Sequence, residues 1–136
     1  MIHSIIEIAI NAGEAILEIY KQDFTVELKT DNSPLTVADK KSNDIIVTAL
    51  KNIDATIPII SEENKLLEYE TRKSWKKCWI VDPLDGTKEF IKKNGEFTVN
   101  IALVENGIPV LGVVHVPAQQ ITYFAEIGKG SFKIEN

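Results

Sequence analysis

The centre of the chain reads Cys78-Trp79-Ile80-Val81-Asp82-Pro83-Leu84-Asp85-Gly86-Thr87, an apolar run that passes directly into carboxylates, a proline, a glycine and a hydroxyl. The apolar part predicts a buried strand, and the Pro and Gly after it predict a turn. Because a strand end is rigid, Asp82 and Asp85 can point at one place, with the Leu84 carbonyl between them. Converging hard oxygen ligands suit Mg²⁺, which binds carboxylates, water and phosphate.

The residues before this stretch predict two helices. Apolar residues recur at helical spacing over 2–21, and a second helix is expected over 37–52, where Thr36 and Asp39 fit a capping box. The other segments are read as a short extended piece at 25–29, a short buried strand at 57–60, and a loop or short helix at 66–77.

The residues after it change to the period of a strand. Strand-like runs over 96–104 and 108–116 are joined by Glu105-Asn106-Gly107, which is a strong hairpin signal. Further elements are expected at 78–82 (strand), 85–91 (short helix), 120–126 (strand) and 131–134 (strand). Helices followed by a meander of strands predict the α+β class, with a helix pair packed on an antiparallel sheet and residues 1–136 forming one domain.

Composition excludes several classes of function. The chain has 136 residues and a net charge of −5, which argues against binding nucleic acid through a basic face. No apolar run approaches the ~20 residues that span a bilayer. The N-terminus has no basic stretch typical of a signal peptide, and Cys78 is the only cysteine, so a cytoplasmic protein without disulfides is expected.

Most of the acidic residues also have a purely structural explanation. Glu62 and Glu63 can open a helix, Asp85 can cap one, and Asp39 can be the capping-box partner of Thr36. None of these explains Asp82, which ends a hydrophobic strand where an unpaired charge is costly. If the strands before Glu62 and Asp82 are neighbours, both acidic groups lie at one edge of the sheet.

Three ordered motifs resemble those of the inositol monophosphatase-like, lithium-sensitive, Mg²⁺-dependent phosphatases. They are Ser33-Pro34-Leu35-Thr36-Val37-Ala38-Asp39, Ser61-Glu62-Glu63 and Trp79 to Thr87. The continuation from Lys88 to Leu103 is similar to the bacterial 3'(2'),5'-bisphosphate nucleotidase branch, the CysQ type. The resemblance implies removal of the 3'-phosphate from adenosine 3',5'-bisphosphate, giving AMP and phosphate, as part of sulfate assimilation.

The resemblance also implies residue roles, in a reaction that uses two or more Mg²⁺ ions. The metal ligands would be Glu62, Asp82, the Leu84 carbonyl and Asp85. The catalytic residues would be Asp39 and Thr87, which orient the attacking water, and Glu62, whose metal activates it. The substrate phosphate would be contacted by Glu62, Leu84, Asp85, Gly86 and Thr87, and Lys29 would lie near the site.

Family members continue into a second α/β half that carries one more metal-binding aspartate, in a Trp-Asp motif. No Trp-Asp dipeptide occurs in this sequence. The 136 residues are therefore expected to be the N-terminal half of such an enzyme, with weak Mg²⁺ binding and little or no activity. Two alternatives stay open. The substrate can be inositol monophosphate or another small phosphate ester, or the chain can be a non-catalytic fragment or interaction domain that pairs with a separately encoded second half. An exposed sheet edge is also expected to allow self-association.

Overall fold

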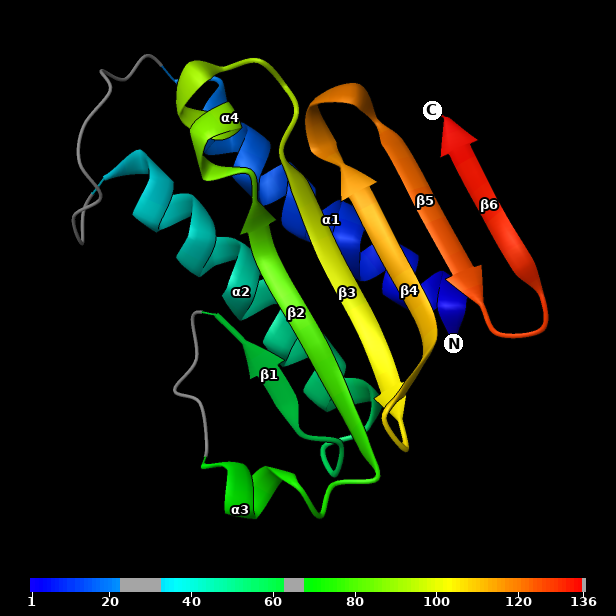
Figure 1. Ribbon diagram of the computed structural model, residues 1–136. Coiled ribbons are helices and arrows are strands. Elements are labelled where there is room, and N and C mark those ends of the chain that lie inside the picture. Colours follow the sequence, from blue (N-terminus) through cyan, green and yellow to red (C-terminus); the bar gives the residue numbers. More distant parts are fainter. Residues whose placement is uncertain (23–32, 63–67, 136) are drawn as a thin grey trace.

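The computed structural model describes residues 1–22, 33–62 and 68–135. Two long helices, α1 (Ile2–Tyr20) and α2 (Pro34–Ile53), lie together on one face of a six-stranded sheet (Figure 1). The other elements are β1 (Ile59–Ser61), α3 (Tyr69–Arg72), β2 (Lys77–Asp85), α4 (Thr87–Lys92), β3 (Thr98–Glu105), β4 (Ile108–Val116), η1 (Pro117–Gln119), β5 (Ile121–Glu126) and β6 (Gly130–Glu135). The predicted α+β class, with a helix pair on a sheet, is confirmed.

The strands lie side by side in chain order, and one pair differs from the rest. From β2 to β6 every pair is antiparallel, as the meander predicted. The pair of β1 and β2 is parallel, with Ser61 opposite Val81. The sheet is therefore mixed. A parallel pair is possible here because a long connection that contains α3 joins β1 to β2, whereas a tight hairpin would make the two strands antiparallel.

The second helix begins three residues earlier than predicted. Ser33 is the N-cap, and its hydroxyl oxygen accepts a hydrogen bond of 3.1 Å from the Thr36 backbone N–H. Pro34 takes the first helical position, where its missing N–H costs nothing. The predicted capping box of Thr36 and Asp39 is therefore wrong, and Asp39 lies inside the helix with only 4% of its surface exposed.

Of two other predictions near the site, the boundary at Asp85 is corrected and the extended piece at 25–29 is not tested. The strand predicted over 78–82 continues to Asp85, so the helix expected from Asp85 begins only at Thr87. The extended piece predicted at 25–29, including Lys29, lies outside the described residues, as does Glu63.

The core lies between the helix pair and the sheet. Alternate residues of β2, β3 and β4 point toward the helices, as a half-buried strand requires. Each fully buried aliphatic or aromatic side chain contributes about 1.5–3 kcal/mol. The members with at most 1% of their surface exposed are Ile5, Ala9, Ala12, Ile16, Ala38, Ile46, Leu50, Trp79, Phe90, Phe97, Val99, Ile101 and Val113. In the described part of the chain, none of the helices combines the length and apolar character that a membrane crossing requires.

The close approach of α1 to β4 depends on Gly13. A Cβ atom at this position would lie 2.8 Å from Cδ2 of His115 and 2.9 Å from Cγ of Pro117. His115 is buried and shares a hydrogen bond of 2.8 Å between its Nδ1 and the Thr122 hydroxyl. Burial lowers the pKa of His115, so the ring packs as a neutral group.

Gly13→Ala should therefore destabilise the protein although alanine is the better helix former. Overpacking against His115 and Pro117 costs about 1–3 kcal/mol, and helix propensity returns up to ~1 kcal/mol, so the free energy of unfolding should fall by about 1–2 kcal/mol. Urea denaturation measures this change. Asn11→Ala, at an exposed position of the same helix, is the control and should be neutral or slightly stabilising. Equal stability of the two variants would contradict the close contact.

Candidate metal site

Two neighbouring strand ends bring acidic side chains to one edge of the sheet. Because β1 and β2 are parallel and Ser61 lies opposite Val81, the next residues, Glu62 and Asp82, follow side by side. Neighbouring strands are about 5 Å apart. The expectation that these two acidic groups meet at one edge is confirmed by this pairing.

A β-bulge sets the relation between Asp82 and Asp85. Asp82 lies opposite Asn100, and Asp85 lies opposite Thr98, so β2 uses one residue more than β3 between these pairs. Pro83 falls inside this irregularity, where its missing N–H interrupts no ladder bond. Asn100 also donates a hydrogen bond of 3.1 Å from Nδ2 to Oδ2 of Asp85. The two carboxylates therefore share Asn100 as a neighbour.

The Asp82 carboxylate lacks full compensation for its charge. Burial raises its pKa from 3.8 to about 6, and the negative charges of Glu62, Asp85 and, least of all, Asp39 act in the same direction. The Leu84 backbone N–H donates a hydrogen bond that opposes this rise. Among the described residues, Oδ1 of Asp82 is a buried oxygen that has no hydrogen-bond partner. A cation at this point would supply the missing interaction.

The carboxylates do not form a finished cage for an ion. Within residues 1–22, 33–62 and 68–135, no group of three or more His, Cys, Asp or Glu side chains is arranged to hold a metal. The side chains of Glu62 and Asp85 are both exposed. Mg²⁺ does not require such a cage, because it keeps several waters and binds through one or two carboxylates plus substrate phosphate. The residues present therefore fit Mg²⁺ in the kind of donor and in charge.

The remaining predicted site residues lie next to this edge. Asp39 projects from α2 and is near enough to affect Asp82. Gly86 has a φ of 89°, and a Cβ there would lie 3.2 Å from Cα of Phe97, so only glycine fits between β2 and α4. Thr87 is exposed at the start of α4, whereas the side chain of Leu84 is buried in the core. Asp39, Glu62, Asp82 and Asp85 thus interact, and Gly86 and Thr87 follow them directly along the chain.

Four polar residues at this edge were assigned no role in the sequence analysis, namely Ser42, Asn43, Ser61 and Asn100. The Ser42 hydroxyl donates a hydrogen bond of 2.7 Å to the Pro83 carbonyl, and the Ser61 hydroxyl donates one of 2.6 Å to Oδ1 of Asn43. Asn100 contacts Asp85 as described above. The spacing of Ser42 and Asn43, three and four residues after Asp39, places them on the same helix face. That spacing is the signal that could have found them.

A groove on the open face of the sheet leads to the acidic residues. It has a volume of about 480 Å³. Its apolar lining includes Ile60, Ile80, Ala102, Gly112 and Val114, and its polar lining consists of Glu62, Asp82 and Asn100. The carboxylates therefore border a space that a small molecule can enter.

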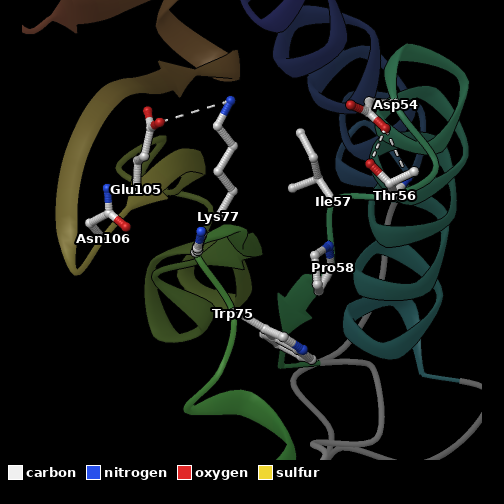
Figure 2. A pocket seen from close by; sticks show the side chains of 9 residues that line it. Asp54, Thr56, Ile57, Pro58, Trp75, Lys77, Glu105 and Asn106 are labelled. Carbon is white, nitrogen blue, oxygen red and sulfur yellow. Dashed lines mark hydrogen bonds and ion pairs between the residues drawn. The ribbon is translucent and has the colours of Figure 1, made fainter.

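A slightly larger pocket, of about 560 Å³, lies at the opposite end of β2 (Figure 2). Three of its four charged residues interact within the protein. Lys77 and Glu105 point toward one another at 4.0 Å, and Oδ1 of Asp54 accepts hydrogen bonds from the backbone and hydroxyl of Thr56. Because these three charges have partners, whereas Oδ1 of Asp82 has none among the described residues, the strand ends and not this pocket are the candidate site.

Asp82→Asn should stabilise the protein when no divalent cation is present. A carboxylate with a raised pKa contributes stability below about pH 4 and loses it as the pH rises through about 6. A shift of about two units corresponds to ~3 kcal/mol, and solvent screening of this half-buried group reduces the effect to about 1–2 kcal/mol. The stability gained by Asp82→Asn, measured by urea denaturation in EDTA, should grow from pH 4 to pH 7 and then stay constant.

Asp54→Asn is the matched control for this pH series. The pKa of Asp54 is lowered by its hydrogen bonds from the side chain and backbone of Thr56, so its charged form is favoured on folding. Its replacement should change stability with the opposite sign, by a loss above pH 4. A stability gain for Asp82→Asn that does not depend on pH would contradict the uncompensated charge.

Comparison with known proteins shows the family of the chain. The model of the inositol monophosphatase family matches residues 1–135. The 3'(2'),5'-bisphosphate nucleotidase CysQ of Salmonella typhimurium is 47% identical over 131 residues, which cover 95% of this chain and 53% of that protein.

Solved structures give the same result. The crystal structure of CysQ from Bacteroides thetaiotaomicron, described as a bacterial member of the inositol monophosphatase family, has a TM-score of 0.89 and 50% identity, covering 98% of this chain and 48% of that one. The extragenic suppressor protein SuhB from Bartonella henselae has a TM-score of 0.80 and 29% identity, with coverages of 97% and 50%. The chain thus spans about half the length of the relatives it matches. It belongs to the inositol monophosphatase family.

Proposed function

We propose that the chain provides the N-terminal domain, and most of the metal site, of a Mg²⁺-dependent phosphatase. Its substrate would be adenosine 3',5'-bisphosphate, which water converts to AMP and phosphate. The observation that carries this proposal is the buried Oδ1 of Asp82, which lies beside Glu62 and Asp85 and has no hydrogen-bond partner in the described part of the chain. The choice of substrate rests on the relatives named 3'(2'),5'-bisphosphate nucleotidase and on the sulfate-assimilation role that the sequence motifs imply.

The proposed ligands of Mg²⁺ are Glu62, Asp82, Asp85 and the Leu84 carbonyl. A bound Mg²⁺ neutralises phosphate charge and lowers the pKa of water. In this proposal Asp39 accepts a hydrogen bond from the attacking water, and the Thr87 hydroxyl helps to orient it. Glu62, Leu84, Asp85, Gly86 and Thr87 form the side of the site that faces the phosphate. Lithium sensitivity is expected to accompany this metal dependence, as in the family that the motifs resemble.

Two further properties complete the proposal. A cytoplasmic location is supported by Cys78, the single cysteine of the sequence, which leaves no pair for an internal disulfide. Self-association is supported by β6, whose six residues are all exposed at the edge of the sheet, and by exposed apolar side chains on β2 and β5 such as Ile80 and Tyr123. Analytical ultracentrifugation over a range of concentrations tests the self-association.

Phosphate release from adenosine 3',5'-bisphosphate tests the activity. The chain covers about half of its relatives, so we expect the 136 residues alone to bind Mg²⁺ weakly and to release little phosphate. Asp82→Asn should abolish Mg²⁺ binding measured by calorimetry and any phosphate release, because it removes the charge of the central carboxylate among the proposed metal ligands. Asp54→Asn, at the other end of the sheet, should leave both unchanged.

The same assay separates the alternatives. Faster release from inositol monophosphate than from adenosine 3',5'-bisphosphate would favour the second substrate. Strong, lithium-sensitive turnover by the 136-residue chain would contradict the expected low activity. Mg²⁺ binding that survives Asp82→Asn would contradict the proposed site itself.

A further inference from the structure

We propose that Ser42 and Asn43 of α2 are positioning residues that hold the two acidic strand ends in place. Each is hydrogen-bonded to one of the strand ends that carry Glu62 and Asp82. The consequence for Mg²⁺ binding rests on the proposed function, whereas the mechanical role does not.

Ser42 fixes the end of β2. Its hydroxyl donates a hydrogen bond of 2.7 Å to the Pro83 carbonyl, and its side chain is completely buried. Pro83 follows Asp82 within the bulge, where the ladder between β2 and β3 is irregular from Asp82 to Asp85. Since the sheet does not hold this segment by regular pairing, the bond from Ser42 supplies a constraint that the ladder lacks.

Asn43 fixes the end of β1. Its Oδ1 accepts a hydrogen bond of 2.6 Å from the hydroxyl of Ser61, the last residue of β1. Both side chains are buried, at 6% and 5% exposure. Because Glu62 is the next residue, this bond fixes the backbone from which the Glu62 side chain projects.

One face of α2 therefore determines the geometry of the whole acidic edge. Asp39 comes three and four residues before Ser42 and Asn43, so all three lie on the side of the helix that meets the strand ends. A helix is a stiff element, and its two side-chain bonds reach two strands that are parallel neighbours. The distances among Asp39, Glu62 and Asp82 are thus set by a single rigid element.

Ordinary satisfaction of buried polar groups is the simpler explanation of these bonds. Alanine at position 42 would suit both a helix and an apolar interface, so stability alone does not require a serine there. If the role is only structural, its loss should weaken the fold as a whole. If the role is positioning, its loss should loosen residues near the bulge and weaken ion binding while the rest of the sheet stays protected.

Ser42→Ala tests the proposal in the full chain, with amide hydrogen exchange as the first measurement. Without divalent cations, the amides of Leu84, Asp85 and Gly86 should exchange about tenfold faster, while those at the centre of β3 stay unchanged. Calorimetric titration with MgCl₂ is the second measurement, and Ser42→Ala should weaken binding by about 10–100-fold, as loss of a group behind a metal ligand does.

Ser74→Ala is the matched control. The Ser74 hydroxyl also donates a hydrogen bond to a backbone carbonyl, that of Thr71, at 3.1 Å, but it is exposed and lies before β2. This variant should leave the exchange rates at residues 84–86 and the Mg²⁺ affinity as in the unmodified chain. Ser61→Ala is a second test variant, because it removes the bond to Asn43 without changing α2, and it should likewise weaken Mg²⁺ binding.

The outcomes separate the two proposals. Uniformly faster exchange across the sheet, or unchanged exchange and affinity in both Ser42→Ala and Ser61→Ala, would overturn the positioning role. Local loosening at residues 84–86 in a chain that binds no Mg²⁺ would support the positioning role and contradict the proposed function. If Ser42→Ala fails to fold, the result for Ser61→Ala decides.

Discussion

The parallel pairing of β1 with β2 is the constraint on which the site depends. In an antiparallel meander, successive strands end at opposite edges of the sheet, so their terminal residues cannot meet. Here the pairing of Ser61 with Val81 makes β1 and β2 end at the same edge, and Glu62 follows beside Asp82. The arrows of β1 and β2 point the same way in Figure 1. An antiparallel β1 would instead have placed Glu62 near Lys77, at the other end of β2. One short strand of three residues thus decides where the acidic chemistry lies.

The rest of the fold supports an arrangement that is electrostatically unfavourable by itself. Negative charges from Glu62, Asp85 and Asp39 act on a half-buried Asp82, and one oxygen of that carboxylate has no partner among the described residues. The stability comes from elsewhere, chiefly from the apolar layer between the helix pair and the sheet. Residues that violate the usual rule for buried charge are typical of functional sites. A cation would convert this local repulsion into attraction.

The fold could largely be predicted from the sequence because its signals are local. The period of α1, the hairpin at Asn106-Gly107 and the meander after it each depend on neighbouring residues, and all were confirmed. The capping box was wrong because Ser33 and Thr36 both suit an N-cap, and only Pro34 at the first helical position decides between them. The acidic motif around Asp82 was also recognisable locally, and the structure brings Glu62 next to it.

What could not be predicted depends on contacts between distant segments. Ser42 and Asn43 read in the sequence as ordinary polar residues of an amphipathic helix, and their partners are Pro83 and Ser61, in other elements. The direction of β1 relative to β2 is equally non-local, since a three-residue strand carries no sign of its partner. The burial of Asp39 became visible only when α2 was found to begin at Pro34.

The open face of the sheet borders the acidic strand ends. Asp82 lies on it with Ile80 and Val114, which are 45% and 39% exposed, while Trp79 and Val81 point to the helices. Burial is already the largest cause of the raised pKa of Asp82. A segment or partner that covers these apolar residues would remove more water from Asp82 and raise the cost of its uncompensated charge. A bound cation would relieve that cost, so covering the face and binding the ion would favour one another. The affinity for the ion would then depend on whether the sheet face is covered, and not on the carboxylates alone.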